Sequence, residues 1–75
     1  MPRHPEESLL QTRKALCQRL NRARIARDEA AELLAVASPR MAEQRERELR
    51  EAQGVLTDRQ RDLDRFDLAQ KAAAA

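Results

Sequence analysis

The sequence predicts an all-α protein, an antiparallel two-helix hairpin with coiled-coil-like packing, on three observations. The chain of 75 residues is 37% charged, 41% apolar and 1% aromatic, with one glycine, a composition typical of long helices and coiled coils. Apolar residues recur at alternating spacings of three and four along two segments, which is the heptad pattern of a helix seam. The pair Ser38-Pro39 separates the two segments.

The first helix is expected over about residues 6–37. Residues 1–5 contain two prolines and little apolar surface, so they are expected to form a flexible N-terminal lead. Pro5 suits the first turn of a helix, and the acidic residues that follow it favour the positive end of the helix dipole. The seam of this segment consists of Leu9, Arg13, Leu16, Leu20, Ala23, Arg27, Ala30, Leu34 and Ala37.

The second helix is expected over about residues 39–71, after a turn at residues 38–39. Serine is a preferred N-cap, and proline is a preferred first helical residue. Residues 72–75 have little to bury and are expected to fray. The second seam consists of Ala42, Arg45, Leu49, Ala52, Leu56, Arg59, Leu63, Phe66, Gln70 and Ala73.

Two similar helices joined by so short a turn must fold back on each other, which predicts a single hairpin over residues 6–71. Gly54 is unfavourable in a helix by about 1 kcal/mol relative to alanine. The heptad register continues unshifted through Gly54, which favours one continuous helix. A kink or a close helix contact at Gly54 is the alternative.

Four arginines occupy seam positions, namely Arg13, Arg27, Arg45 and Arg59. An arginine at such a position can lay its methylene stem over the seam while its guanidinium reaches the edge. Alternatively, charged seam residues fix the register of the helices or meet acidic groups on a partner.

No set of residues predicts catalysis, a metal site or a cofactor site, so we expect a protein that is not an enzyme. Cys17 is the only cysteine and His4 the only histidine, which is too few for a disulfide or a structural zinc site. The longest apolar run outside the terminal alanines covers residues 33–37. That run is too short for a signal peptide or a membrane span. We therefore expect a cytoplasmic protein without membrane insertion.

Residues 8–27 contain six basic side chains and no acidic one. The basic segment 13–27 makes a small nucleic-acid-associated or regulatory helical protein the alternative function, because arginines bind phosphates with salt-dependent affinity. These side chains point almost all round a helix, however, and the chain has no tyrosine or tryptophan to stack bases.

Several apolar residues lie outside both seams, where a two-helix hairpin does not bury them. Such leftover surface predicts self-association or docking onto a helical partner. Scattered exposure without function is the other interpretation. The predicted partner-binding residues are Leu10, Cys17, Ile25, Leu33, Val36, Val55 and Leu68.

Over about residues 9–66 the layout resembles the small helical-hairpin co-chaperones of bacterial type III secretion systems. The resemblance involves residues 15–20 (ALCQRL), the proline-bearing turn at residues 38–39, and residues 53–56 (QGVL). It implies a non-enzymatic cytosolic chaperone or adaptor subunit that stabilises a helical partner. In that family the partner is the needle subunit. The co-chaperone and a helical-repeat chaperone bind it jointly in the bacterial cytosol. No binding residue is carried over from the family.

Overall fold

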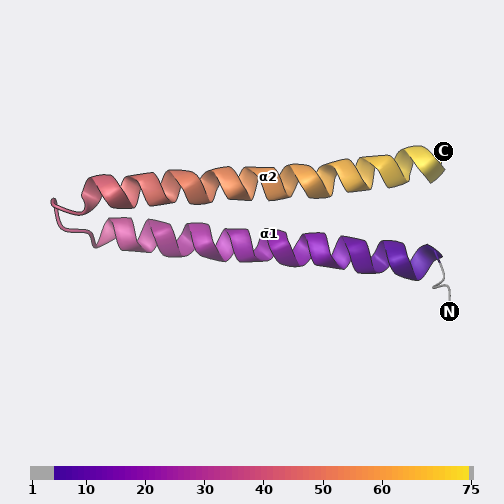
Figure 1. Cartoon of the computed structure of the whole chain (residues 1–75), viewed down its shortest axis with the longest axis horizontal. Coiled ribbons are helices and arrows are strands. Elements are labelled where there is room, and N and C mark those ends of the chain that lie inside the picture. Colours follow the sequence, from indigo (N-terminus) through magenta and orange to yellow (C-terminus); the bar gives the residue numbers. More distant parts are fainter. Residues whose placement is uncertain (1–4, 75) are drawn as a thin grey trace.

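The chain folds as a hairpin of two long helices in a computed structural model that describes residues 5–74, with side chains described from Ser8 onward. Helix α1 spans Pro5–Ala35 and helix α2 spans Ala42–Ala74. They run side by side in opposite directions, so the start of α1 and the end of α2 lie at one end of a rod measuring 55 × 26 × 13 Å (Figure 1). The predicted all-α hairpin is confirmed.

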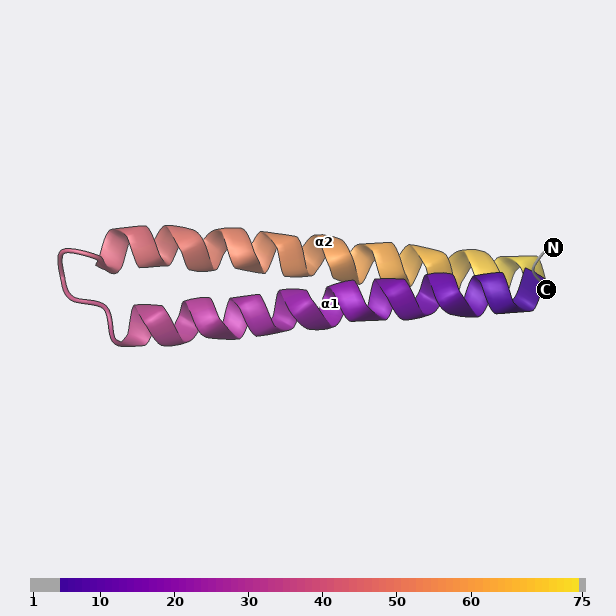
Figure 2. The same ribbon diagram turned by 60° about the horizontal axis from the view of Figure 1, so that its bottom comes forward.

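The connection between the helices is longer than the predicted turn at residues 38–39. It covers residues 36–41 and closes around the carbonyl of Ser38, which accepts hydrogen bonds from the amides of Met41 at 2.9 Å and Ala42 at 3.0 Å. At the end of α1, the amide of Ala37 bonds three residues back to Leu34, which tightens the last turn. Ser38 and the N–H-free Pro39 thus begin a separate turn that leads into α2. Figure 2 shows the whole connection as an open loop at the closed end of the hairpin.

The outer ends of both helices extend beyond the predicted bounds. Helix α1 begins at Pro5, because a proline at the first helical position gives up only a donor that would be unpaired there. Helix α2 continues to Ala74, because alanine has the highest helix propensity of all residues. Residues 1–4 of the predicted lead, with His4, and the last alanine lie outside the described residues.

The core is one thin strip between the helices. Its buried residues are Leu20, Ala23, Ala30 and Leu63, and no side chain within the described residues is fully buried. The predicted seams are confirmed, since every seam position from Leu16 to Gln70 is buried or half-buried. Near the open end of the hairpin, Leu9, Arg13 and Ala73 are exposed because the described part of the chain does not cover them.

Helix α2 passes through Gly54 without a break, as the unshifted register predicted. The Thr57 hydroxyl donates to the carbonyl of Gln53 at 3.0 Å, so Thr57 bonds within the helix and caps no new one. A Cβ atom added at Gly54 would meet nothing within 4 Å. The alternative of a close helix contact at Gly54 is therefore wrong.

The hairpin exposes far more surface than a compact protein of its mass. Its accessible area is 6283 Å², whereas a compact monomer of 8.6 kDa exposes about 4,700 Å². The radius of gyration is 17.2 Å, against about 11 Å for a compact domain of this length. About 1,600 Å² of surface that a compact fold would bury therefore stays in contact with solvent.

Candidate interaction surfaces

Each of the four seam arginines pairs with a carboxylate of the hairpin itself. Three of them are half-buried and pair within their own helix, while Arg13 is exposed and pairs with the other helix. Half-burial of Arg27, Arg45 and Arg59 with their guanidinium groups paired at the surface agrees with the first interpretation, whereas the pairing of Arg13 across the helices agrees with a role in register. The pairs are Arg13–Asp67 at 2.9 Å, Arg27–Asp28 at 2.8 Å, Arg45–Glu48 at 2.9 Å and Arg59–Asp62 at 3.7 Å.

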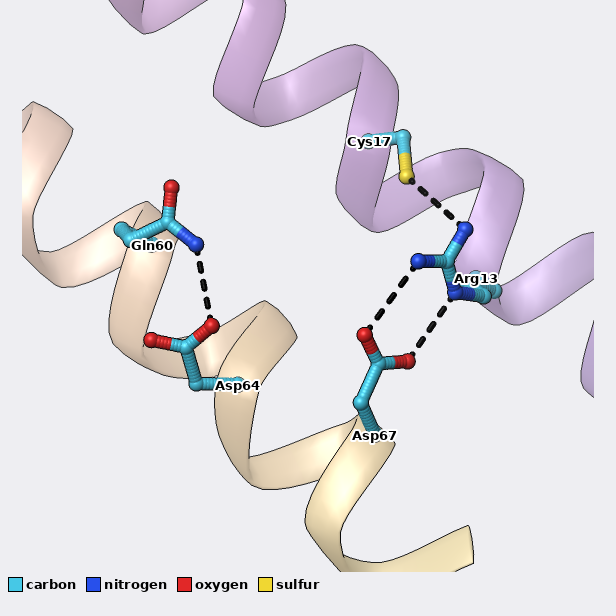
Figure 3. Close-up of polar contacts among 5 residues, drawn as sticks. All are labelled: Arg13, Cys17, Gln60, Asp64 and Asp67. Atoms are coloured by element: carbon cyan, nitrogen blue, oxygen red, sulfur yellow. Dashed lines mark hydrogen bonds and ion pairs between the residues drawn. The ribbon is translucent and has the colours of Figure 1, made fainter. Parts of the chain in front are cut away.

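The Arg13–Asp67 pair is bidentate and joins α1 to α2 near the open end (Figure 3). Nε of Arg13 donates to Oδ1 of Asp67 at 2.9 Å, and Nη2 donates to Oδ2 at 3.2 Å. These bonds lower the pKa of Asp67 and raise the pKa of Arg13. Because two parallel bonds fix both distance and orientation, this pair is the polar contact best placed to hold the helices in register.

A second carboxylate is held in its charged form within α2. Glu48 accepts hydrogen bonds from Arg45 at 2.9 Å and from Gln44 at 3.2 Å. The bond from Arg45, followed by the bond from Gln44, lowers the pKa of Glu48.

Cys17 is the one predicted partner-binding residue that is half-buried. Its sulfur accepts a weak hydrogen bond from Nη1 of Arg13 at 3.7 Å. Figure 3 shows Cys17 beside the Arg13–Asp67 pair, across from α2, where Gln60 donates to Asp64 at 3.0 Å. The thiol thus lies at the edge of the helix interface.

The other six predicted partner-binding residues are exposed. Val36 is the most exposed at 82%, followed by Leu10 at 69% and Leu68 at 68%. Ile25, Val55 and Leu33 keep between 44% and 50% of their surface in solvent. Within the described residues, no segment of the chain folds over them.

The seven residues do not form one surface. Leu10, Cys17 and Leu68, here called the terminal set, lie in the half of the rod that contains the helix ends. Ile25, Leu33 and Val36 are here called the turn set: Ile25 and Leu33 lie on α1 toward the connection, and Val36 is the first residue of the connection. At 1.5 Å per residue, Leu10 and Leu33 are about 35 Å apart along α1. One helix docking across the rod would not reach both sets.

Two members of the turn set line a surface hollow of about 460 Å³ together with two glutamates. Its lining residues are Glu29, Glu32, Leu33 and Val36, and we call it the acidic hollow. Sequence reasoning identified the aliphatic residues but not the glutamates. Their spacing signals it, because Glu29, Leu33 and Val36 follow each other at four and three residues along one face.

Val55 lies in a second hollow, of about 380 Å³, which both helices line. Its residues are Arg19, Arg22, Ala23, Val55 and Arg59, and we call it the arginine hollow. Arg59 was predicted only as a seam residue. Its position at the seam edge brings it to the side of α1 where Arg19 and Arg22 lie.

Metal binding and membrane insertion have no visible basis in the described part of the chain. Over residues 8–74, no three or more His, Cys, Asp or Glu side chains are grouped so that they would hold a metal ion. Neither described helix has a stretch apolar enough to cross a membrane.

In comparisons with known proteins, no family model, curated protein or solved structure matches the chain.

Proposed function

We propose that the protein is a non-enzymatic interaction module, a small chaperone or adaptor subunit that stabilises a helical partner. The carrying observation is the exposed surface, about 1,600 Å² more than a compact protein of this mass exposes. A standard protein interface takes about 800 Å² from each partner. The hairpin thus has ample surface for one partner and enough for two.

The exposed aliphatic side chains supply the driving force for such binding. Burying apolar surface contributes roughly 25 cal/mol per Å², and the terminal and turn sets each offer three apolar residues. A partner helix fits this surface because an amphipathic helix presents apolar side chains at spacings of three and four residues. The exposed apolar residues of the hairpin are also carried on helices, so the two sets of side chains can pack against each other. A type III secretion needle subunit, as the family resemblance implies, is one helical partner to test.

Co-purification followed by binding of purified components tests this function. A tagged hairpin is isolated from its own cells, and the protein retained in stoichiometric amount is produced separately and titrated with the hairpin. We expect the mixture to be more helical and to melt at a higher temperature than the two components do separately. A mixture whose helicity and melting equal the sum of its parts would refute the proposal.

Two variants locate the partner surface. Leu10→Gln with Leu68→Gln makes the terminal set polar, and Ile25→Gln with Val36→Gln does the same for the turn set. All four side chains are at least half exposed, so the hairpin should keep its helicity. Glu43→Gln is the matched control on the solvent face, because the Glu43 side chain is 89% exposed. Retention of the partner by both double variants would contradict the proposed role of these sets.

The arginine hollow favours nucleic-acid association as the second candidate function. Arg19 and Arg22 from α1 and Arg59 from α2 converge on it, and guanidinium groups bind phosphates bidentately. Changing Arg19, Arg22 and Arg24 to glutamine should then abolish binding to a short DNA or RNA duplex. The control changes Arg61 and Arg65, which are exposed on α2. Equal loss in both variants would indicate only non-specific attraction of a basic protein.

A further inference from the structure

The two hollows are lined by side chains of opposite charge, and residues of α1 line both of them. Arg19 and Arg22 line the arginine hollow, and Glu29 and Glu32 line the acidic hollow. Within residues 8–74, none of these four side chains forms an ion pair, although every seam arginine does. Helix α1 therefore presents two cations and two anions that the hairpin itself leaves unpaired.

These four charges are arranged symmetrically along α1. Arg22 and Glu29 are equally far from the midpoint between Ile25 and Ala26, and so are Arg19 and Glu32. If two copies of α1 cross antiparallel at that midpoint, Arg22 of each copy faces Glu29 of the other, because these two residues share one face of the helix. Arg19 and Glu32 lie on opposite flanks of that face and do not form a second pair. A parallel arrangement in register would instead place like charges opposite each other, which is unfavourable.

The positions between these charges fit the same arrangement. In the antiparallel pairing, Leu33 faces Gln18 and Val36 faces Ala15, while Ile25 lies beside the symmetry axis. The outward positions recur at intervals of three or four residues, which keeps them on one side of the helix, and all are exposed in the hairpin. They are Ala15, Gln18, Arg22, Ile25, Glu29, Leu33 and Val36.

We propose that a second copy of this chain docks antiparallel along the outer face of α1, so that Glu29 of the acidic hollow in each copy meets Arg22, at the edge of the arginine hollow, in the other. Such an interface is self-complementary, and a two-fold axis closes it into a dimer. It extends from residue 15 to residue 36, about 32 Å of helix. The excess exposed surface of about 1,600 Å² exceeds the roughly 800 Å² that a standard interface takes from each partner.

The dimer deepens the proposed function, since it assigns an occupant to the turn set and leaves the terminal set for another helical partner. It does not need that second partner in order to form. Dimerisation and partner binding are therefore separate measurements.

Charge reversal of one pair tests the dimer. The variants are Arg22→Glu, Glu29→Arg, and both changes in one chain, and molar mass is measured by light scattering over a wide concentration range. The wild-type chain should reach twice its 8.6 kDa mass. Each single variant places like charges together twice in its dimer, which should weaken dimerisation about ten- to a hundredfold. The double variant restores opposite charges and should dimerise as the wild type does.

Mixing the two single variants gives the sharpest result. In a mixed dimer one copy is acidic at positions 22 and 29 and the other is basic at both, so both contacts are attractive. We expect a one-to-one heterodimer to form from two weakly associating components. Far-ultraviolet circular dichroism of each variant checks that the helices remain intact, as expected for exposed positions.

Either of two results would overturn the dimer. One is a wild-type chain that stays monomeric at every concentration. The other is a set of single variants that dimerise as tightly as the wild type, which would place the second copy on another face. A monomeric hairpin that still binds its helical partner would refute the dimer and leave the proposed function standing, and a dimer without any other partner would do the reverse.

Discussion

Replacing Gly54 with alanine should stabilise the hairpin. Gly54 lies inside α2 at a helical backbone position without positive φ, and an added Cβ would meet nothing within 4 Å. The substitution therefore adds no clash and buries nothing, so its whole effect is the difference in helix propensity. That difference is about 1 kcal/mol in favour of alanine, because alanine has less backbone freedom to lose on folding.

The magnitude is large enough to measure by thermal unfolding. With about 2.1 cal/mol/K of unfolding entropy per residue, 75 residues give about 160 cal/mol/K, and 1 kcal/mol then raises Tm by about 6 °C. Ala69→Gly is the matched control, because Ala69 is exposed in the same helix. It should lower Tm by a similar amount. Both are compared at one protein concentration, since self-association also shifts Tm.

A neutral or destabilising Gly54→Ala would refute this reasoning. It would mean that something approaches Gly54 closely in solution, and only a partner or a second copy is available to do so. The concentration dependence of Tm in the variant would then separate these cases, because only contact with a second copy becomes stronger as the hairpin is concentrated.

Two further predictions concern the core and the carboxylates. Leu20→Ala should lower the free energy of unfolding by about 2–4 kcal/mol, because Leu20 is only 5% exposed and its truncation leaves a cavity. The control Leu68→Ala, at an exposed position, should change the free energy of unfolding by less than about 0.5 kcal/mol. Urea unfolding at equal protein concentration compares the two variants. The pKa values of Asp67 and Glu48 are lower in the folded chain than their ordinary values, so the stability they contribute is fully present above the ordinary carboxyl pKa of about 4 and is lost as pH falls through the lowered values. Asp67→Asn should flatten the fall in Tm below pH 4, and an unchanged acid profile would show that the Arg13 pair contributes nothing in solution.

The fold followed from the sequence because heptad spacing and the break at Ser38-Pro39 are local signals. Seam residues as far apart as Leu20 and Leu63 are buried as the spacing predicted. The bounds of the connection did not follow, because they are set by local backbone bonds, such as those from Met41 and Ala42 to the carbonyl of Ser38, which the spacing of apolar residues does not specify. The sequence pattern specifies which face is buried more strongly than it specifies where a helix ends.

The candidate surfaces were predicted only in part, for a different reason. The exposure of Val36 and Leu10 could be predicted, because the helix period places both residues away from the seam. The arginine hollow depends on Arg59 of α2 coming beside Arg19 and Arg22 of α1. That juxtaposition depends on the relative rotation and register of two helices. Neither is encoded in the spacing within one helix, so the arginine hollow becomes visible only when both helices are placed.

The arginines of this chain fall into two groups, those that pair with carboxylates of the hairpin and those that do not. We assign the first group to folding and the second to association. Arginines on the seam are paired with carboxylates of the hairpin, so their charge is already matched when the two helices come together. Arg19 and Arg22 lie at the edge of that interface and lack such partners among the described side chains. Exposed charges of this kind contribute little to the stability of a monomer but strongly bias which surfaces meet and in which orientation. The unpaired charges of α1 therefore serve the docking of a second chain. Reversing the charge at Arg22 should alter association and leave the hairpin folded.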